Sequence, residues 1–123
     1  MPGQPVHFEI PASDTAKGRE FWTGLFGWQF QEYGGPVEYH MTQLGDQMGG
    51  AVYNNPEGNA DGIRLYFDVD DIKVGSARVR ELGGKAGEAL PVPSMGWFSA
   101  CKDNGGNDFG LWQTDPAAPS PGA

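Results

Sequence analysis

The sequence of 123 residues contains the same pattern of predicted strands and helix twice. A strand-like run at Val6–Ile10 leads into a helix-like segment that ends at Gly27. About sixty residues later, a similar run at Leu65–Val69 leads into a second such segment, which ends at Gly83-Gly84. Each copy closes with a glycine-rich turn and a short strand. Two copies of a β-α-β-β-β unit predict one pseudo-symmetric α+β domain, with a ligand cleft between the copies.

Alternating apolar residues predict strands, and apolar residues spaced three or four apart predict two helices. Ser13 or Asp14 is expected to cap the first helix, and Asp70 or Asp71 the second. Pro11 is expected to end the first strand. The predicted strands cover residues 6–10, 28–33, 37–44, 48–53, 64–69, 85–90, 97–102 and 108–113, and the predicted helices cover residues 15–26 and 72–82. The residues expected on the core side of the helices are Gly18, Phe21, Trp22, Leu25 and Phe26, then Ile72, Gly75, Val79 and Leu82.

The domain organisation follows from where the turn-forming residues gather. The predicted first module covers about residues 5–54, and the second covers about residues 63–114. Residues 55–62 are read as the linker, and residues 115–123, which are rich in proline, are read as a disordered tail.

The charge and cysteine content of the chain restrict the kinds of molecule that it can bind and the compartment in which it works. A formal net charge of −8 argues against nucleic acid or an anionic membrane, since both require basic surfaces. The single cysteine, Cys101, fits a reducing compartment, and neither a membrane span nor a secretion signal is expected. We therefore expect a cytoplasmic protein that binds a small molecule.

Polar residues of the predicted paired strands share one face. Side chains alternate along a strand, so the apolar residues of each run should face a helix and the others should face away. If the two sheets curl into a cup, its floor carries seven such residues: His7, Glu9, Arg64, Tyr66, Asp68, Asp108 and Trp112. Ionisable and aromatic groups on one concave surface are typical of a small-molecule site. The alternative is that they form the solvated faces of half-exposed strands.

Three segments together resemble the vicinal oxygen chelate superfamily, which includes glyoxalases, bleomycin-resistance proteins and extradiol dioxygenases. They are Ser13-Asp14 with the helix that ends Phe21-Trp22-Thr23-Gly24-Leu25-Phe26-Gly27-Trp28, then Phe67-Asp68-Val69-Asp70-Asp71 with Leu82-Gly83-Gly84-Lys85, and then residues 103–112. The resemblance covers about residues 5–114. It implies two β-α-β-β-β modules, related by a pseudo-two-fold axis, whose mixed sheet forms a cup.

The resemblance also locates the metal ligands of metal-using members, at the start of the first strand and on the last strand of each module. Those positions are expected to fall on Pro5, Arg64, Gly50 and Gly110. None of these side chains is a ligand for a divalent metal, so no metal cofactor is expected. A shift of two residues in the first strand would instead place His7 in a ligand position.

Two functions and one further role remain open. The first is metal-free binding of an aromatic or amphipathic small molecule, with Arg64, Trp97, Asp108 and Trp112 as contacts. The second is lyase or isomerase chemistry on a carbonyl compound, with His7 as base, Glu9 orienting it, and Tyr66 or Asp68 as acid. The third is a regulatory or scaffold subunit without a ligand. A homodimer is expected in each case.

Overall fold

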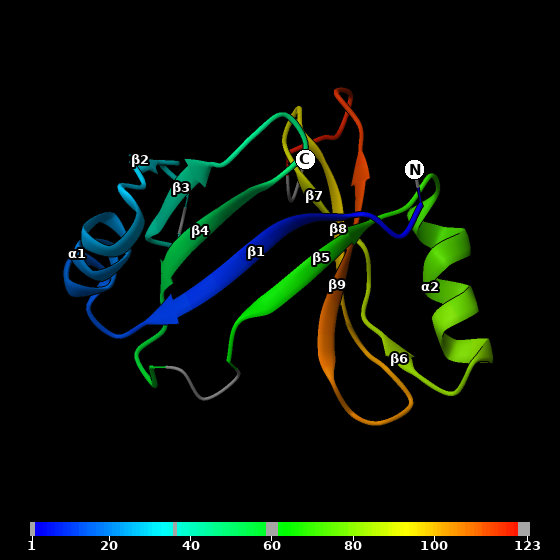
Figure 1. Cartoon of the computed structure of the whole chain (residues 1–123). Helices are drawn as coiled ribbons and strands as arrows, with labels where there is room; N and C mark the ends of the chain where they lie inside the picture. The colour runs from blue at the N-terminus through cyan, green and yellow to red at the C-terminus, as the bar shows by residue number, and fades with distance from the viewer. Residues whose placement is uncertain (1, 36, 59–61, 121–123) are drawn as a thin grey trace. The chain divides into compact units, whose positions relative to one another are not determined.

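A computed structural model describes residues 2–35, 37–58 and 62–120 (Figure 1). Its contacts divide the chain into two compact units. The N-terminal unit is His7–Arg64, and the C-terminal unit runs from Leu65 onward and includes the residues up to Val6. The boundary after Arg64 lies close to the predicted start of the second module. The assignment of the first residues to the C-terminal unit was not predicted.

The N-terminal unit has the element order β-α-β-β-β. Its elements are β1 (Pro5–Ala12), α1 (Thr15–Phe26), β2 (Gln31–Glu32), β3 (Tyr39–Gln43) and β4 (Gly49–Asn54). The strands lie in the order β2-β3-β4-β1. β1 runs parallel to β4, whereas β3 is antiparallel to both of its neighbours.

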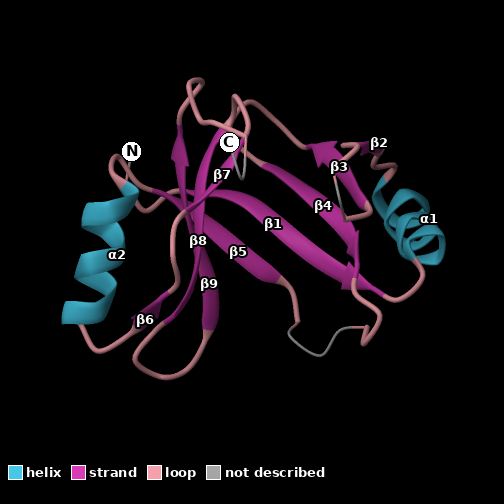
Figure 2. Ribbon diagram, turned by 180° about the vertical axis from the view of Figure 1, so that it is seen from behind, coloured by secondary structure: helices cyan, strands magenta, loops and turns pink. Residues whose placement is uncertain are grey.

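The C-terminal unit follows this order with one additional strand, β-α-β-β-β-β. Its elements are β5 (Arg64–Asp68), α2 (Ile72–Glu81), β6 (Lys85–Ala86), β7 (Leu90–Val92), β8 (Gly96–Lys102) and β9 (Asp108–Thr114). β5 runs parallel to β9, β9 is antiparallel to β8, and β8 pairs with both β6 and β7. Each unit therefore holds one helix and a mixed sheet, which confirms the predicted α+β class (Figure 2).

The residues before β1 attach to the C-terminal unit through the backbone of Asp68. The Gly3 amide donates to the Asp68 carbonyl at 2.8 Å, and the Asp68 amide donates to the Gln4 carbonyl at 2.9 Å. These two bonds extend the pairing of β5 and explain why the contacts group residues up to Val6 with that unit.

Both helices begin at the predicted aspartates. The Asp14 carboxylate accepts from the Lys17 amide at 3.1 Å, and the Asp71 carboxylate accepts from the Lys73 and Val74 amides at 2.9 and 3.2 Å. Such caps satisfy amides of the first turn that have no partner within the helix. α1 ends at Gly27, whose φ of 73° is the left-handed conformation that glycine adopts without steric cost.

Replacing Asp71 by alanine is expected to lower the free energy of unfolding by about 1 kcal/mol, because two amides of α2 lose their acceptor. Urea unfolding followed by circular dichroism measures the change. Asp70→Ala is the matched control, since Asp70 precedes the cap and should change the stability by less than about 0.5 kcal/mol. Equal losses in the two variants would contradict the assignment of the cap to Asp71.

The core of the N-terminal unit lies between its sheet and α1. Phe8 is buried over Gly50, where an added Cβ would lie 2.1 Å from its ring. Val52 is fully buried, and a Cβ at Gly18 of α1 would lie 3.3 Å from it. From Phe8 a series of aromatic rings, with centroids 5.1 to 6.4 Å apart, extends from this core to the surface: Phe8, Trp22, Phe26, Trp28 and Phe30.

The core of the C-terminal unit lies between α2 and strands β8 and β9. Its buried centre consists of Ile72, Cys101 and Leu111. Cys101 is 3% exposed and thus belongs to the apolar core.

Several residues expected to face a core are exposed instead. Of α1, Phe21, Leu25 and Phe26 are 61%, 57% and 59% exposed, because the helix approaches the sheet through Thr15 and Gly18. Leu82 and Leu65 are also exposed, at 61% and 40%. The periodicity correctly predicts the helix and its apolar face, but that face is wider than the surface that the sheet covers, so part of it stays exposed.

Some element boundaries also differ from the prediction. β1 continues through Pro11 to Ala12, since Pro11 still pairs with Tyr53 of β4. The strand expected at residues 28–33 shortens to Gln31–Glu32, and the one expected at 85–90 divides into β6 and β7. The predicted tail is ordered in part, because Ser94 donates to the buried Ala118. Residues 59–61 of the linker and 121–123 of the tail lie outside the described residues.

Candidate functional site

A set of polar and aromatic side chains lies on the sheet face of the N-terminal unit that points away from α1. Val52 faces α1, so the residues on either side of it in β4, and their partners in β1 and β3, face the other way. We call this surface the open face. Its members are His7 and Glu9 of β1, Tyr39 and Met41 of β3, and Ala51 and Tyr53 of β4.

Hydrogen bonds link His7 to Glu9 through Tyr39. The Tyr39 hydroxyl donates to Glu9 Oε2 at 2.8 Å, and His7 Nε2 lies 2.6 Å from the same hydroxyl oxygen. A phenol has one proton, and here Glu9 receives it. His7 must therefore donate from Nε2, which leaves the lone pair of a neutral ring on Nδ1. The prediction that Glu9 orients His7 takes a more indirect form, because Tyr39 stands between the two.

The electrostatic environment of His7 keeps its imidazole neutral. Burial lowers the pKa of His7 below its usual value of 6.5, and the nearby Glu9 carboxylate opposes part of that shift. A neutral imidazole held in one tautomer can accept a proton at Nδ1, and Glu9 can stabilise the resulting cation through Tyr39. The three side chains thus have the composition and order of a general base with its supporting groups.

The lowered pKa of His7 predicts a dependence of stability on pH. The unfolded chain binds a proton at His7 more readily than the folded chain does, so this contribution is complete above pH 6.5 and is lost as the pH falls through the folded pKa. Chemical unfolding between pH 7.5 and 5 should therefore show a steeper loss of stability in the wild-type protein than in His7→Gln. Parallel curves for the two proteins would contradict the lowered pKa.

Tyr39 is also the centre of an aromatic group on the open face. Its ring centroid lies 6.3 Å from that of His7, 6.2 Å from that of Tyr33 and 6.5 Å from that of Tyr53. The ring of His7 is nearly parallel to that of Tyr39, with an interplanar angle of 14°. Tyr39 is not among the site residues predicted from the sequence, although its place between Glu38 and His40 in an alternating strand was a usable signal.

The second histidine, His40, lies on the other face of the same sheet, which faces α1. His40 is buried, and its Nε2 lies 2.8 Å from Glu38 Oε2. Thr15 at the start of α1 donates to the same oxygen at 2.5 Å. Hydrogen bonds from His40 and Thr15 hold the pKa of Glu38 below its usual range. These contacts tie β3 to α1, so His40 does not belong to the open face.

The other predicted site residues fall in the C-terminal unit or at its edge. Tyr66 is buried against Gly110, where an added Cβ would lie 2.2 Å from its ring, and the ring contacts Phe98. Asp108 forms an ion pair with Lys102 at 2.7 Å across β8 and β9. The backbone of Asp68 pairs with the first residues of the chain, and Arg64 begins β5. Hence the structure brings together His7 and Glu9 through Tyr39, whereas Tyr66 and Asp68 belong to the other unit.

Trp97 and Trp112, both expected to contact the small-molecule ligand, lie on opposite faces of their sheet. Trp97 pairs with Gln113, and Trp112 pairs with Phe98. Gln113 faces α2, since its side-chain oxygen accepts from the Ile72 amide at 2.9 Å. Trp97 therefore faces α2 and Trp112 faces away, so the two rings cannot share one ligand within this unit.

The two units can be aligned through a contact that each one contains. In the N-terminal unit Val52 packs against Gly18 of α1, and in the C-terminal unit Leu111 packs against Gly75 of α2. Each glycine is the fourth residue after the aspartate that caps its helix. Val52 and Leu111 are consequently equivalent positions of the last strands.

This alignment corrects the predicted symmetry. The residue before Val52 pairs with Glu9, and the residue before Leu111 pairs with Tyr66. The equivalent positions are therefore His7 with Arg64, Glu9 with Tyr66, and Ala51 with Gly110. The sequence repeat, in which Val6–Ile10 corresponds to Leu65–Val69, predicts instead that Tyr66 matches His7 and Asp68 matches Glu9, which is a displacement of two residues.

The same correction applies to the expected metal positions. If Arg64 and Gly110 are the positions in the second module, their equivalents in the first are His7 and Ala51, not Pro5 and Gly50; Gly50 in fact faces α1 beneath Phe8. One imidazole, one guanidinium and two residues without a donor do not fit a divalent metal. Among residues 2–35, 37–58 and 62–120, no group of three or more potential ligands could hold a metal ion.

Comparison with known proteins places this arrangement in a family. Residues 4–111 match the Glyoxalase/Bleomycin resistance protein/Dioxygenase superfamily. A putative glyoxylase, CFP32, of Mycobacterium tuberculosis is 28% identical over an alignment of 121 positions, which covers 92% of this chain and 46% of that protein. A glyoxylase-like domain-containing protein of Didymella fabae is 32% identical over an alignment of 90 positions, which covers 68% of this chain and 70% of that protein.

A solved structure shows the same fold at low sequence identity. A methylmalonyl-CoA epimerase in complex with methylmalonyl-CoA and NH4+ has a TM-score of 0.77 and 14% identity, over 98% of this chain and 100% of that one. The chain spans about half the length of the mycobacterial relative. In the part of the chain that the structure describes, no helix is long and apolar enough to cross a membrane.

Proposed function

We propose that this chain, which belongs to the Glyoxalase/Bleomycin resistance protein/Dioxygenase superfamily, binds a small aromatic or amphipathic molecule without the usual metal. The observation that carries the proposal is the group of rings around Tyr39 on the open face. Aromatic walls with a few polar groups are typical of sites for organic molecules. The poor set of metal donors supports the metal-free form of the proposal.

Charge favours a cationic ligand. The formal net charge of −8 attracts cations over several ångströms of solvent. On the open face itself the Glu9 carboxylate lies next to the tyrosine hydroxyl at its centre. A planar cation could stack on the rings and approach this carboxylate, whereas a planar anion would meet repulsion.

Calorimetric titration with 9-aminoacridine, a planar cation, tests the proposal, and naphthalene-2-sulfonate is the anionic counterpart. The cation should bind to the wild-type protein, and Tyr39→Leu should weaken binding by about tenfold, because the central ring is lost. Tyr39→Phe is the matched control: it keeps the ring and removes only the hydroxyl, so binding should change by less than about threefold. Equal binding to Tyr39→Leu and the wild type would disprove the site.

A second candidate function is acid–base catalysis on a carbonyl compound, as a lyase or isomerase. The hydrogen-bonded series His7, Tyr39 and Glu9 favours it, because binding alone does not require an imidazole held in a single tautomer. His7 Nδ1 would remove the proton next to a carbonyl, and Glu9 would stabilise the imidazolium. Because the solved neighbour holds methylmalonyl-CoA, an acyl-CoA is the first probe to examine for exchange of that proton.

A homodimer is the assembly that the surface of α1 supports. Its exposed apolar residues Phe21, Leu25 and Phe26 form a patch unusual for a surface helix. A second copy of this chain is a reasonable occupant, since the mycobacterial relative is about twice as long. Leu25→Glu should convert a dimer into a monomer in light scattering after size exclusion, while Glu20→Ala, on the same helix, should not. A monomeric wild-type protein would disprove the dimer.

A further inference from the structure

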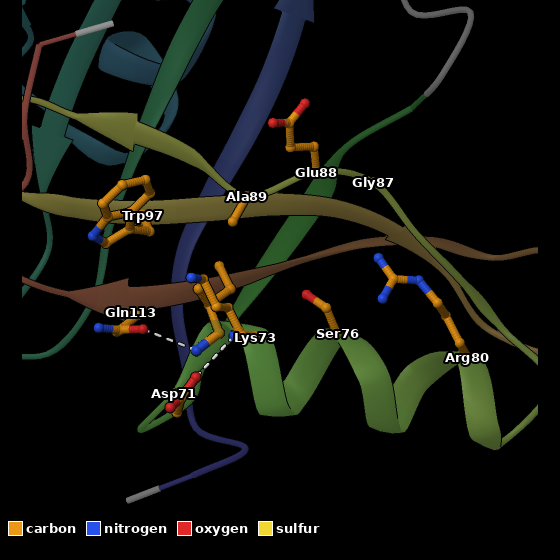
Figure 3. Close-up of a pocket in the computed structure, with 10 residues that line it drawn as sticks. Asp71, Lys73, Ser76, Arg80, Gly87, Glu88, Ala89, Trp97 and Gln113 are labelled. Atoms are coloured by element: carbon orange, nitrogen blue, oxygen red, sulfur yellow. Dashed lines mark hydrogen bonds between the residues drawn. The ribbon is translucent and has the colours of Figure 1, made fainter. Parts of the chain in front are cut away.

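The C-terminal unit contains a cleft on the face of its sheet that carries α2, and no other part of the proposed function uses it. The cleft has a volume of about 650 Å³ and lies between α2 and the segment from β6 to β8 (Figure 3). This volume is within the range of sites for drug-sized molecules. Its walls come from residues 71–80 of α2 and its cap, residues 87–89, Trp97 and Gln113.

Ser76 gives this cleft a polar centre that the fold leaves unsatisfied. The residue is 5% exposed, and its hydroxyl has no hydrogen-bond partner among the described residues. Figure 3 shows the hydroxyl directed from α2 into the cleft. A buried hydroxyl without a partner reduces the stability of the folded state, so a polar ligand atom at this position would remove a cost that the protein otherwise bears.

The positively charged side chain of Arg80 also lines the cleft. Arg80 follows Ser76 by four residues, so both side chains lie on the same face of α2. One of its terminal nitrogens donates to the Ala86 carbonyl of β6 at 3.1 Å, which fixes the guanidinium at the edge of the cleft and leaves other N–H groups for a ligand. The hydroxyl and the guanidinium thus both line the cleft from the same helix and both carry hydrogen-bond donors, which are the groups that a carboxylate accepts from.

The acidic residues of the lining do not oppose an anion at these donors. Asp71 lies at the start of α2, where its carboxylate accepts from two amides. Figure 3 shows the Glu88 carboxylate on the opposite wall, directed away from the helix. Lys73, on the same side of the cleft as Ser76, adds a second positive charge.

The other end of the cleft combines an apolar and aromatic surface with the polar side chains of Asp71, Lys73 and Gln113. Trp97 lines it next to Ile72 and Ala89. The indole N–H of Trp97 is already engaged, since it donates to Asp115 Oδ2 at 3.0 Å. The ring therefore offers its apolar surface to the cleft. From Ile72 to Arg80 the helix rises about 12 Å, which sets the length of a molecule that touches both ends.

We propose that this cleft is a second ligand site, which binds an amphipathic carboxylate with its acid group between Ser76 and Arg80 and its apolar body against Trp97. The site lies wholly within the C-terminal unit and is separate from the open face of the N-terminal unit. It goes beyond the proposed function, because the two sites favour ligands of opposite charge.

The probe for this site is 4-phenylbutyrate, and 4-phenylbutan-1-ol is its uncharged counterpart. Titration into the ¹⁵N-labelled full-length protein at pH 7 should give saturable shifts of the Ser76 and Arg80 amides and of the Trp97 indole N–H. The alcohol should bind at least tenfold more weakly. Equal affinities for acid and alcohol, shifts confined to residues 7–64, or no saturable shift at millimolar concentrations would each overturn the proposal.

Two variants assign the contacts. Arg80→Met should weaken 4-phenylbutyrate at least tenfold, whereas Arg78→Met, which alters an exposed arginine two residues away, should leave its affinity unchanged. Ser76→Ala should weaken the acid and raise the melting temperature by about 3 °C, because it removes an unpaired buried hydroxyl. A lowered melting temperature in Ser76→Ala, or equal losses of affinity in the two arginine variants, would overturn the proposal.

Discussion

Exchange of the proton next to the carbonyl of an acyl-CoA probe is expected to slow by about 10²- to 10⁴-fold when His7 is replaced by glutamine. Glutamine can still donate a hydrogen bond to Tyr39, so the neighbouring side chains keep their partner. It has no basic lone pair to match Nδ1, so proton removal is lost while the shape of the open face is retained. Proton NMR in D₂O measures the rate directly.

The second histidine provides the control for this experiment. His40→Gln alters a buried side chain on the α1 side of the sheet, so it should lower stability without changing the rate per folded molecule. Tyr39→Phe should give an intermediate loss of rate, because the base remains but Glu9 no longer stabilises its cation through the hydroxyl. Equal rates in His7→Gln and the wild type would exclude His7 as the base and leave the binding function alone.

The largest effect on stability is expected from Gly96→Ala at the start of β8. A Cβ at Gly96 would lie 2.2 Å from the Gln113 carbonyl oxygen and 2.6 Å from the Trp112 ring. The carbonyl belongs to the neighbouring strand and cannot move without disturbing the pairing of β8 with β9. The free energy of unfolding should therefore fall by about 3 kcal/mol or more, as overpacking of a fixed backbone does.

Gly24→Ala is the matched control for that substitution. Gly24 lies within α1, and a Cβ there would meet no atom within 4 Å. Alanine is the better helix former, so the same chemical change should raise the stability by about 0.5 to 1 kcal/mol. Urea unfolding of both variants, followed by circular dichroism, gives the two signs. A loss of less than 1 kcal/mol in Gly96→Ala would mean that β8 can move away from β9.

Local chemistry explains which parts of the fold could be predicted from the sequence. The caps at Asp14 and Asp71 and the end of α1 at Gly27 depend on hydrogen bonds and backbone conformations within a few residues, so they could be predicted. The continuation of β1 past Pro11 could not, because it depends on pairing with β4, which is forty residues away in the chain. Exposure of the apolar side chains of α1 is likewise set by the tertiary contact through Gly18.

The candidate site was predicted in part for the same reason. Alternation along β1 placed His7 and Glu9 on one face correctly. It could not show that Tyr39 of β3 joins them, since that requires the register between strands far apart in sequence. Nor could it show that Trp97 and Trp112 face opposite ways, because Trp97 was never assigned to a face.

The attachment of Gly3 and Gln4 to Asp68 determines where this chain can be divided. The repeat in the sequence suggests cutting between the two copies, but a fragment that begins at Leu65 would lack the two backbone partners of Asp68. A fragment in which residues 2–6 and then a short linker precede β5 would restore these two partners. An N-terminal fusion or tag, by contrast, would be joined to the residues that pair with the C-terminal unit, even though it precedes the first copy of the repeat.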